Sequence, residues 1–174
     1  MIYLVRHGET DFNRFSITQG HTDTSLNKKG LEQAQNLSEK LKNYNFDIVF
    51  CSSLTRAKQT CDYIMKYHNC PVYYDSRLME RGKGVLERHK NTPEKYAEFF
   101  ADSHKFDGET EEDVLKRVSA FLRDLKKYKK KNILIVSHGG VYAYIKHYLE
   151  KKDIRKDPIE KLDMENCQII EIVF

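Results

Sequence analysis

Residues 132–140 read NILIVSHGG, and this stretch is the most strand-like in the chain. The apolar run Ile133–Val136 favours a buried strand, and Ser137-His138-Gly139-Gly140 ends it with polar and small residues. A helix is predicted to follow from Val141 to Leu149. The order of strand, polar turn and helix is typical of an α/β unit, and it places His138 directly after a strand.

Two further strands end in the same way. Ile2–Val5 is a short β-prone run that is followed at once by Arg6-His7-Gly8, so His7 also lies just after a predicted strand. Asp47–Cys51 is a second apolar run, and Ser52-Ser53 ends it. The next predicted helix carries Arg56 in its first turn. Three polar side chains therefore follow three separate strands.

The rest of the chain alternates between helix and strand patterns. Apolar residues recur at helical spacing from Leu31 to Tyr44 and again from Thr110, whose hydroxyl can cap its helix with Asp113. Strands are predicted at Val72–Tyr74 and Gln168–Phe174. We therefore predict an α/β fold, a three-layer α/β/α sandwich with a mostly parallel sheet.

One segment interrupts this alternation. Residues 80–105 are strongly charged, contain two glycines and Pro93, and show one short helical patch, Tyr96–Phe100. We interpret approximately residues 80–107 as a small lid insertion within a single domain of residues 1–174. Packing of the lid is the favoured interpretation for Tyr96, Phe99 and Phe100, and contact with a ligand is the alternative.

Composition excludes several classes of protein. The 174 residues are 40% hydrophobic and 32% charged, which is typical of a globular chain, and the net charge of +4 is too balanced to predict a nucleic-acid-binding surface. The basic run Lys126–Lys131 is interpreted as a solvated helix end. No apolar stretch is long enough to span a membrane and no leader peptide is recognisable, so we expect a cytoplasmic protein. The four cysteines show no metal-site spacing.

The three strand ends suggest a shared site. Ligands of parallel α/β sheets bind beyond the carboxyl ends of the strands, where His7, Arg56 and His138 are predicted to lie. A neutral imidazole can attack phosphorus and later leave, so His7 is the candidate nucleophile. Arg6, Arg56 and His138 could hold the charged phosphoryl oxygens. Two histidines could instead bind a metal, but no ligand-like spacing is present and the arginines would repel a cation, so neither metal nor cofactor is predicted.

Five ordered sequence blocks run from the first predicted strand to the last predicted helix. The first is Leu4-Val5-Arg6-His7-Gly8-Glu9-Thr10, which continues through Asn13, Gln19-Gly20, Asp23, Leu26, Gly30 and Gln33-Ala34. The second is Ser52-Ser53-Leu54-x-Arg56-Ala57-x-Gln59-Thr60. The last three are Leu78-x-Glu80 with Gly84 and Glu87, Gly108-Glu109-Thr110 with Arg117, and Val136-Ser137-His138-Gly139-Gly140. Together they resemble the signature of the histidine phosphatase superfamily, the phosphoglycerate mutase-like proteins.

The resemblance implies a role for each matching residue. His7 is the phosphorylated nucleophile, Glu80 the proton donor, and Arg6, Arg56 and His138 form the phosphate pocket. The same pocket is expected to be lined by Asn13, Gln19, Gly20 and Gly139. Arg81, in the predicted lid, is a further candidate for binding an anionic substrate. One departure from the family pattern is Arg88, which stands where the third block usually has glycine.

We therefore predict a phosphatase that hydrolyses a small phosphomonoester. The alternative is a mutase of the phosphoglycerate mutase type, which would need paired arginines in a longer insertion than this chain has. A non-catalytic phosphate- or protein-binding module on the same fold is a further alternative, although it would not need both a nucleophile and an acid. Nucleic-acid binding through the lysine run is the least favoured, membrane binding is not expected, and no feature of the sequence indicates an oligomeric state.

Overall fold

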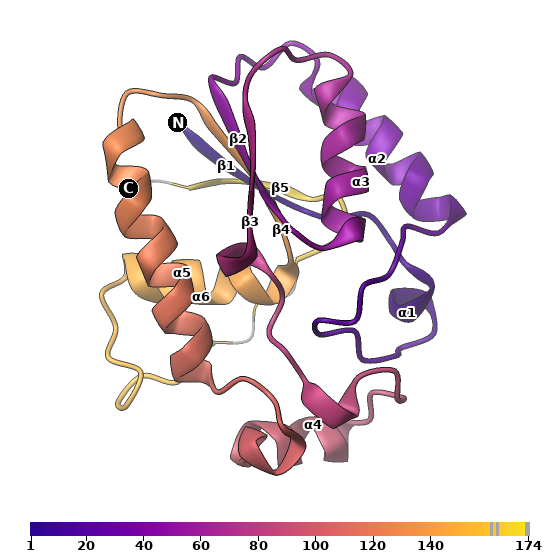
Figure 1. The fold of residues 1–174 in the computed structure, drawn as a ribbon, viewed down its shortest axis with the longest axis vertical. Helices are drawn as coiled ribbons and strands as arrows, with labels where there is room; N and C mark the ends of the chain where they lie inside the picture. The colour runs from indigo at the N-terminus through magenta and orange to yellow at the C-terminus, as the bar shows by residue number, and fades with distance from the viewer. Residues whose placement is uncertain (161, 163, 173–174) are drawn as a thin grey trace.

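A computed structural model describes residues 1–160, 162 and 164–172, and its centre is a five-stranded sheet with the order β3-β2-β4-β1-β5 (Figure 1). The strands are β1 (Ile2–Arg6), β2 (Ile48–Ser52), β3 (Val72–Asp75), β4 (Ile133–Ser137) and β5 (Ile169–Ile172). The first four are parallel, and β5 runs antiparallel to β1 at one edge. The predicted mostly parallel sheet is confirmed.

Helices cover both faces of this sheet. The α-helices are α1 (Asp11–Arg14), α2 (Lys28–Leu41), α3 (Thr55–Met65), α4 (Pro93–Ala101), α5 (Glu111–Leu125) and α6 (Gly139–Leu149). Four 3-10 turns complete the pattern: η1 (Ser76–Leu78), η2 (Gly84–Leu86), η3 (Ser103–Phe106) and η4 (Lys126–Tyr128). Figure 1 shows α2 and α3 on one side of the sheet and α5 and α6 on the other. This is the expected α/β/α sandwich.

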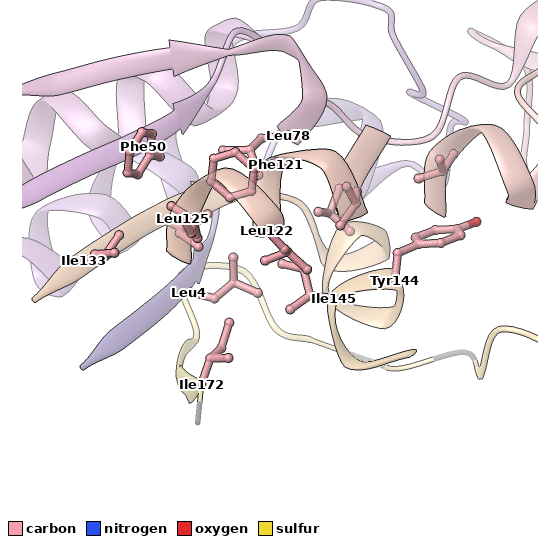
Figure 2. Close-up of a cluster of buried hydrophobic side chains, with 14 of the residues drawn as sticks. Leu4, Phe50, Leu78, Phe121, Leu122, Leu125, Ile133, Tyr144, Ile145 and Ile172 are labelled. Atoms are coloured by element: carbon pink, nitrogen blue, oxygen red, sulfur yellow. The ribbon is translucent and has the colours of Figure 1, made fainter. Parts of the chain in front are cut away.

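The central strands β2 and β4 are apolar up to their final serine, and all of their residues are buried, because helices cover both faces of the sheet there. Leu4 packs in the cluster formed with α5 and α6, and its neighbour Val5 packs in the cluster formed with α2 and α3. Figure 2 shows the first cluster, in which Leu4 of the sheet lies close to Leu122 of α5 and Ile145 of α6. Burial on both sides fixes each strand in the sheet, and the residues that follow the strands emerge together at one edge.

Helix starts depart from the predictions where the first turn is polar. Helix α2 begins at Lys28, three residues before Leu31, because the Asn27 side chain caps it by accepting a hydrogen bond from Gly30 N at 2.8 Å. Helix α6 begins at Gly139 rather than at Val141, with His138 as its extended N-cap residue. The predicted Thr110 cap is confirmed by a reciprocal pair of hydrogen bonds with Asp113.

The segment predicted as a lid folds into η2, α4 and η3. It is tied to the loop after α1 by hydrogen bonds between the main chains of Thr18 and Arg88 and from Thr18 to His89, each at 2.9 Å. Arg88, the residue that replaces the family glycine, has a φ of 68°, a conformation that favours glycine. That this segment acts as a lid within one domain stays a prediction. Residues 173–174 of the predicted last strand lie outside the described residues.

Candidate active site

A cavity of about 440 Å³ lies beyond the carboxyl ends of the parallel strands. His7 follows β1, Arg56 lies in the first turn of α3 after β2, and His138 follows β4. Because β2, β4 and β1 are adjacent in the sheet, these three residues meet at one edge, as expected. Nine of the ten predicted site residues line the cavity: Arg6, His7, Asn13, Gln19, Gly20, Arg56, Glu80, Arg81 and Gly139. His138 is fully buried behind this lining.

His7 is held as a neutral imidazole with one nitrogen available. Its Nδ1 lies 2.7 Å from the carbonyl oxygen of Gly8, which can only accept, so Nδ1 carries the proton and Nε2 keeps its lone pair. The pKa of His7 is lowered well below 6.5, first by burial and then by the positive charges of Arg56 and Arg6. The Gly8 amide is in turn held by the Thr60 hydroxyl at 3.0 Å.

The main chain around His7 is fixed from both sides. The His7 amide donates to the carbonyl of Ser137 at 3.0 Å, which ties the end of β1 to the end of β4. Late in the chain, the Asn166 side chain donates to the His7 carbonyl at 2.8 Å, and the Cys167 amide donates to the Arg6 carbonyl at 3.0 Å. The backbone that carries the imidazole is therefore anchored by residues from β4 and from the approach to β5.

His138 packs against His7 and is held by a hydroxyl. Its Nε2 lies 2.8 Å from Ser52 Oγ, at the end of β2. Its Nδ1 is buried and has no hydrogen-bond partner among the residues that the structure describes. The pKa of His138 is lowered well below 6.5 by burial, and further by the charge of Arg56. If Ser52 donates to Nε2, Nδ1 carries a proton that is available to an oxygen of a ligand.

Two arginines bring fixed positive charge to the cavity. The Arg56 guanidinium is buried and donates to the carbonyls of Gly20 and Thr22, at 2.9 Å each. Burial lowers the pKa of Arg56 to about 10, so it stays charged at neutral pH. Arg6 is anchored through a hydrogen bond from its side chain to the carbonyl of Met164. Both cations are suited to binding a phosphate group.

The amides of Asn13 and Gln19 are oriented by one threonine. The hydroxyl of Thr10 lies 3.0 Å from Asn13 Oδ1 and 2.9 Å from Gln19 Oε1. Because the oxygens are used in these contacts, the NH2 groups of Asn13 and Gln19 are the parts that can donate toward the cavity. Thr10 was not among the predicted site residues, because its contribution depends on its contacts with both Asn13 and Gln19.

Glu80 brings a carboxyl group to the same cavity. Its Oε1 accepts a hydrogen bond from the Arg81 amide at 2.9 Å, and its Oε2 accepts one from the Gly140 amide at 3.3 Å, at the start of α6. A Cβ on Gly140 would lie 2.3 Å from Glu80 Oε1, so any larger residue there would displace this carboxylate. The glycine pair of the motif thus makes room for the carboxylate.

The structure brings further residues to the cavity that were not among the ten predicted site residues. Tyr96 and Phe100 of α4 line it, whereas Phe99 is buried between the helix and its surroundings, so the packing interpretation holds only for Phe99. Lys83 lines it from the segment after Glu80. The apolar part of the lining comes mostly from α6 and the segment before β5: Ala143, Tyr144, Ile159, Leu162 and Met164. Spacing alone could not reveal these residues, because they come from separate elements.

The described residues show neither a metal-binding cluster nor a membrane-spanning helix. Within residues 1–160, 162 and 164–172, no three His, Cys, Asp or Glu side chains are grouped so that they could hold a metal ion. None of the helices in the described part of the chain is long and apolar enough to cross a membrane.

Comparison with known proteins gives a consistent result. The model of the histidine phosphatase superfamily (branch 1) matches residues 2–174. A broad-specificity phosphatase of Saccharomyces cerevisiae is 36% identical over 160 residues, which cover 86% of this chain and 70% of the relative. The probable phosphoglycerate mutase GpmB of Escherichia coli is 34% identical over 150 residues, covering 79% and 69%. The crystal structure of a putative α-ribazole-5′-P phosphatase from Escherichia coli has a TM-score of 0.78 and 32% identity, covering 88% of this chain and 81% of that one.

Proposed function

Because the chain belongs to the histidine phosphatase superfamily and is a phosphatase of small phosphorylated metabolites, we propose that it acts through a covalent phosphohistidine at His7. The observation that carries this proposal is the state of the His7 ring, whose Nδ1 is occupied by the Gly8 carbonyl and whose pKa is held well below 6.5. A neutral ring with a free Nε2 at the floor of a cavity has the form that a nucleophile requires.

The first step transfers the phosphoryl group to the protein. Nε2 of His7 forms a bond to phosphorus while the bond between phosphorus and the ester oxygen breaks. The leaving oxygen needs a proton, and Glu80 is proposed to supply it from its carboxylic acid form. Arg6 and Arg56 balance the charge on the phosphoryl oxygens, and the amides of Asn13 and Gln19 can donate to them.

The second step returns the protein to its starting state. Glu80, now a carboxylate, takes a proton from a water molecule, whose oxygen bonds to phosphorus as the bond to Nε2 breaks. Inorganic phosphate leaves, and His7 is again a neutral imidazole. His138, with its Nδ1 lacking a partner, is proposed to donate to a phosphoryl oxygen in both steps. Neither step uses a metal ion or an organic cofactor.

Hydrolysis is favoured over phosphoryl return to a second substrate. A mutase would have to hold its product against the phosphohistidine while excluding water, and the predicted lid carries no pair of arginines for that purpose. Between Glu80 and Gly108 the only arginines are Arg81 and Arg88, and Arg88 is exposed and bonded to Thr18 through its main chain. Relatives of both kinds are similar to this chain, so the competing activity is part of the test.

We also propose a cytoplasmic location. Cys51, Cys61, Cys70 and Cys167 are all free thiols, which suits a reducing compartment. The substrate is proposed to be a small molecule rather than a nucleic acid, since the cavity is closed on several sides by side chains and the overall charge is nearly balanced.

The test compares wild type with His7→Ala in the presence of a chelator. Two activities are measured: phosphate release from a panel of phosphomonoesters, and isomerisation of 3-phosphoglycerate. Phosphate release is expected in wild type and should be lost in the variant. Rapid acid-free quenching with labelled substrate should trap an acid-labile phosphoprotein. His104→Ala, which removes an exposed histidine of η3, is the matched control. Isomerisation faster than release would establish a mutase, and turnover that survives His7→Ala would exclude the proposed nucleophile.

A further inference from the structure

Lys83 extends a positive charge into the cavity that holds His7. It lies three residues after Glu80, and its side chain lines the cavity wall together with Tyr96 and Phe100 of α4. Its main chain is fixed, because the Lys83 amide donates to the Glu87 carboxylate at 2.9 Å. The ammonium group therefore occupies a defined place on the wall formed by the segment after Glu80.

Three aromatic rings surround this ammonium group. Lys83 Nζ lies 4.1 Å from the ring centre of Phe99, 4.7 Å from that of Phe100 and 5.2 Å from that of Tyr96. Contacts of this kind stabilise a cation less than full hydration does. The rings thus position the charge without neutralising it.

No carboxylate of the described residues forms a direct ion pair with it either. In the part of the chain that the structure describes, no Asp or Glu oxygen forms an ion pair with Lys83 Nζ. The nearest comparable cation, Arg81, faces the same two rings at 4.6 Å from Phe99 and 4.8 Å from Phe100, and it is paired with Glu111 at 3.7 Å. Burial, and then the charge of Arg81, lower the pKa of Lys83 to about 8. A cation kept partly out of water without a counter-ion favours binding of an anion.

Additional lysines lie on the same side of the cavity. A smaller cavity of about 40 Å³ shares Lys83, Asn91 and Tyr96 with the large one and is also lined by Lys90 and Lys95. Lys83 therefore stands between the two cavities. The wall after Glu80 is basic, whereas Ile159, Leu162 and Met164 make another part of the lining apolar.

We propose that Lys83 binds a second acidic group on the substrate, so that the preferred substrates are phosphomonoesters whose leaving group carries a carboxylate or another phosphate. This inference rests on the proposed function, because it assumes that His7, Arg6 and Arg56 hold the ester phosphoryl group. Lys83 is assigned to the leaving group because it comes from the segment after Glu80, the proposed acid, and not from a strand end. Its role is to select the substrate.

The test uses two pairs of esters that differ only in the second group. The first pair is 3-phosphoglycerate and glycerol 1-phosphate, and the second is propane-1,3-diyl bisphosphate and 3-hydroxypropyl phosphate. In at least one pair, wild type is expected to have the higher kcat/KM for the more acidic member. A preference in the first pair indicates that the second group is a carboxylate, and a preference in the second pair indicates a phosphate. Lys83→Met should reduce that preference about tenfold or more, mainly through KM, and Lys83→Arg should retain most of it.

Lys58→Met is the matched control, because Lys58 Nζ lies 5.3 Å from the ring centre of Tyr74 and Lys58 is not among the residues that line the cavity. It should leave all four values unchanged. The inference is overturned if wild type hydrolyses both members of each pair equally well, or if Lys83→Met slows all four esters by the same factor. If no ester shows His7-dependent turnover, it is the proposed function that fails. Calorimetric binding of each pair to His7→Ala, with and without Lys83→Met, then still decides the role of Lys83.

Discussion

His7 and His138 pack edge to face with their ring centres 5.1 Å apart, and both rings are buried. Each is held by a different group, His7 by the carbonyl of Gly8 and His138 by the hydroxyl of Ser52. Two imidazoles at this distance, with Arg56 beside them, cannot both be protonated without strong repulsion. The pair is therefore neutral, and that fact governs how the protein responds to pH.

The first prediction concerns acid. Because the pKa values of His7 and His138 are lowered, the rings stay unprotonated below pH 6.5, and kcat/KM should show no acid limb at the usual histidine value. In the unfolded chain the same rings bind protons near pH 6.5, so the free energy of unfolding should fall as the pH decreases below that value. A pH profile of kcat/KM and denaturant titrations at several pH values check both parts. An acid limb near 6.5 that depends on His7 would contradict the first.

The second prediction concerns the hydroxyl that holds His138. Ser52→Ala removes the partner of Nε2 and leaves the ring free to change tautomer, so kcat should fall by about tenfold, the size expected for one lost hydrogen bond. Nitrogen NMR of the labelled ring should show mixed tautomers in this variant. Ser53→Ala, at the neighbouring half-buried position, is the control and should behave like wild type. Unchanged kcat and a single tautomer in Ser52→Ala would rule out this positioning role.

The third prediction separates acid catalysis from binding. Glu80→Gln keeps the size of the side chain but cannot donate an acidic proton, so kcat for an alkyl phosphate should fall by about 10²–10⁴-fold. The loss should be much smaller for p-nitrophenyl phosphate, whose leaving group is stable without a proton. Glu98→Gln, at an exposed position of α4, serves as the control. Equal losses for both esters would mean that Glu80 acts only in binding or folding.

The fourth prediction concerns Arg88. Its φ of 68° is unfavourable for any residue with a Cβ, and its side chain is exposed, so Arg88→Gly should raise the free energy of unfolding by about 0.5–1 kcal/mol. Lys116→Gly, at an exposed site within α5, should instead lower it by about 1 kcal/mol. Thermal or urea unfolding of the two variants measures both changes. A loss of stability in Arg88→Gly would show that the arginine side chain makes a contribution larger than the backbone strain.

The fifth prediction follows the charge of Lys83. Burial, and then the charge of Arg81, lower the pKa of Lys83 to about 8, whereas Glu80, Glu111 and Glu87 oppose that shift. Above pH 8 the ammonium group loses its proton, so the KM for an ester with a second acidic group should rise toward the value of Lys83→Met. Steady-state kinetics from pH 6.5 to 9.5 would show this, and Lys83→Arg should remove the rise. A flat KM in wild type would contradict the assignment.

Much of the fold could be predicted because its signals are local. The buried strands are continuous apolar runs, and the residues after them had to meet at one sheet edge whatever the details of packing. Helix ends were less predictable, since a polar first turn such as the one after Asn27 carries no apolar pattern. The position of each residue after a predicted strand was enough to identify His7, Arg56 and His138 as site residues, without any knowledge of distances.

The rest of the site could not be predicted because it depends on contacts between distant residues. Ser52 and His138 are 86 positions apart, and the local sequence around neither residue predicts the hydrogen bond between them. The rings around Lys83 come from α4, where the same pattern suits either packing or ligand contact. The apolar lining from Ile159, Leu162 and Met164 belongs to a segment without periodicity, so only the folded chain reveals it.

The pairing of β1 with β5 has a consequence for how the protein is made. The strand that leads to His7 leaves the ribosome before the other four strands of the sheet, yet its backbone is completed by Asn166, Cys167 and the strand that follows them. Contacts with so large a separation along the chain form late. A nascent chain can assemble most of its sheet and still have no finished nucleophile, so the polypeptide should be catalytically silent during translation and become active only once β5 has emerged from the ribosomal tunnel.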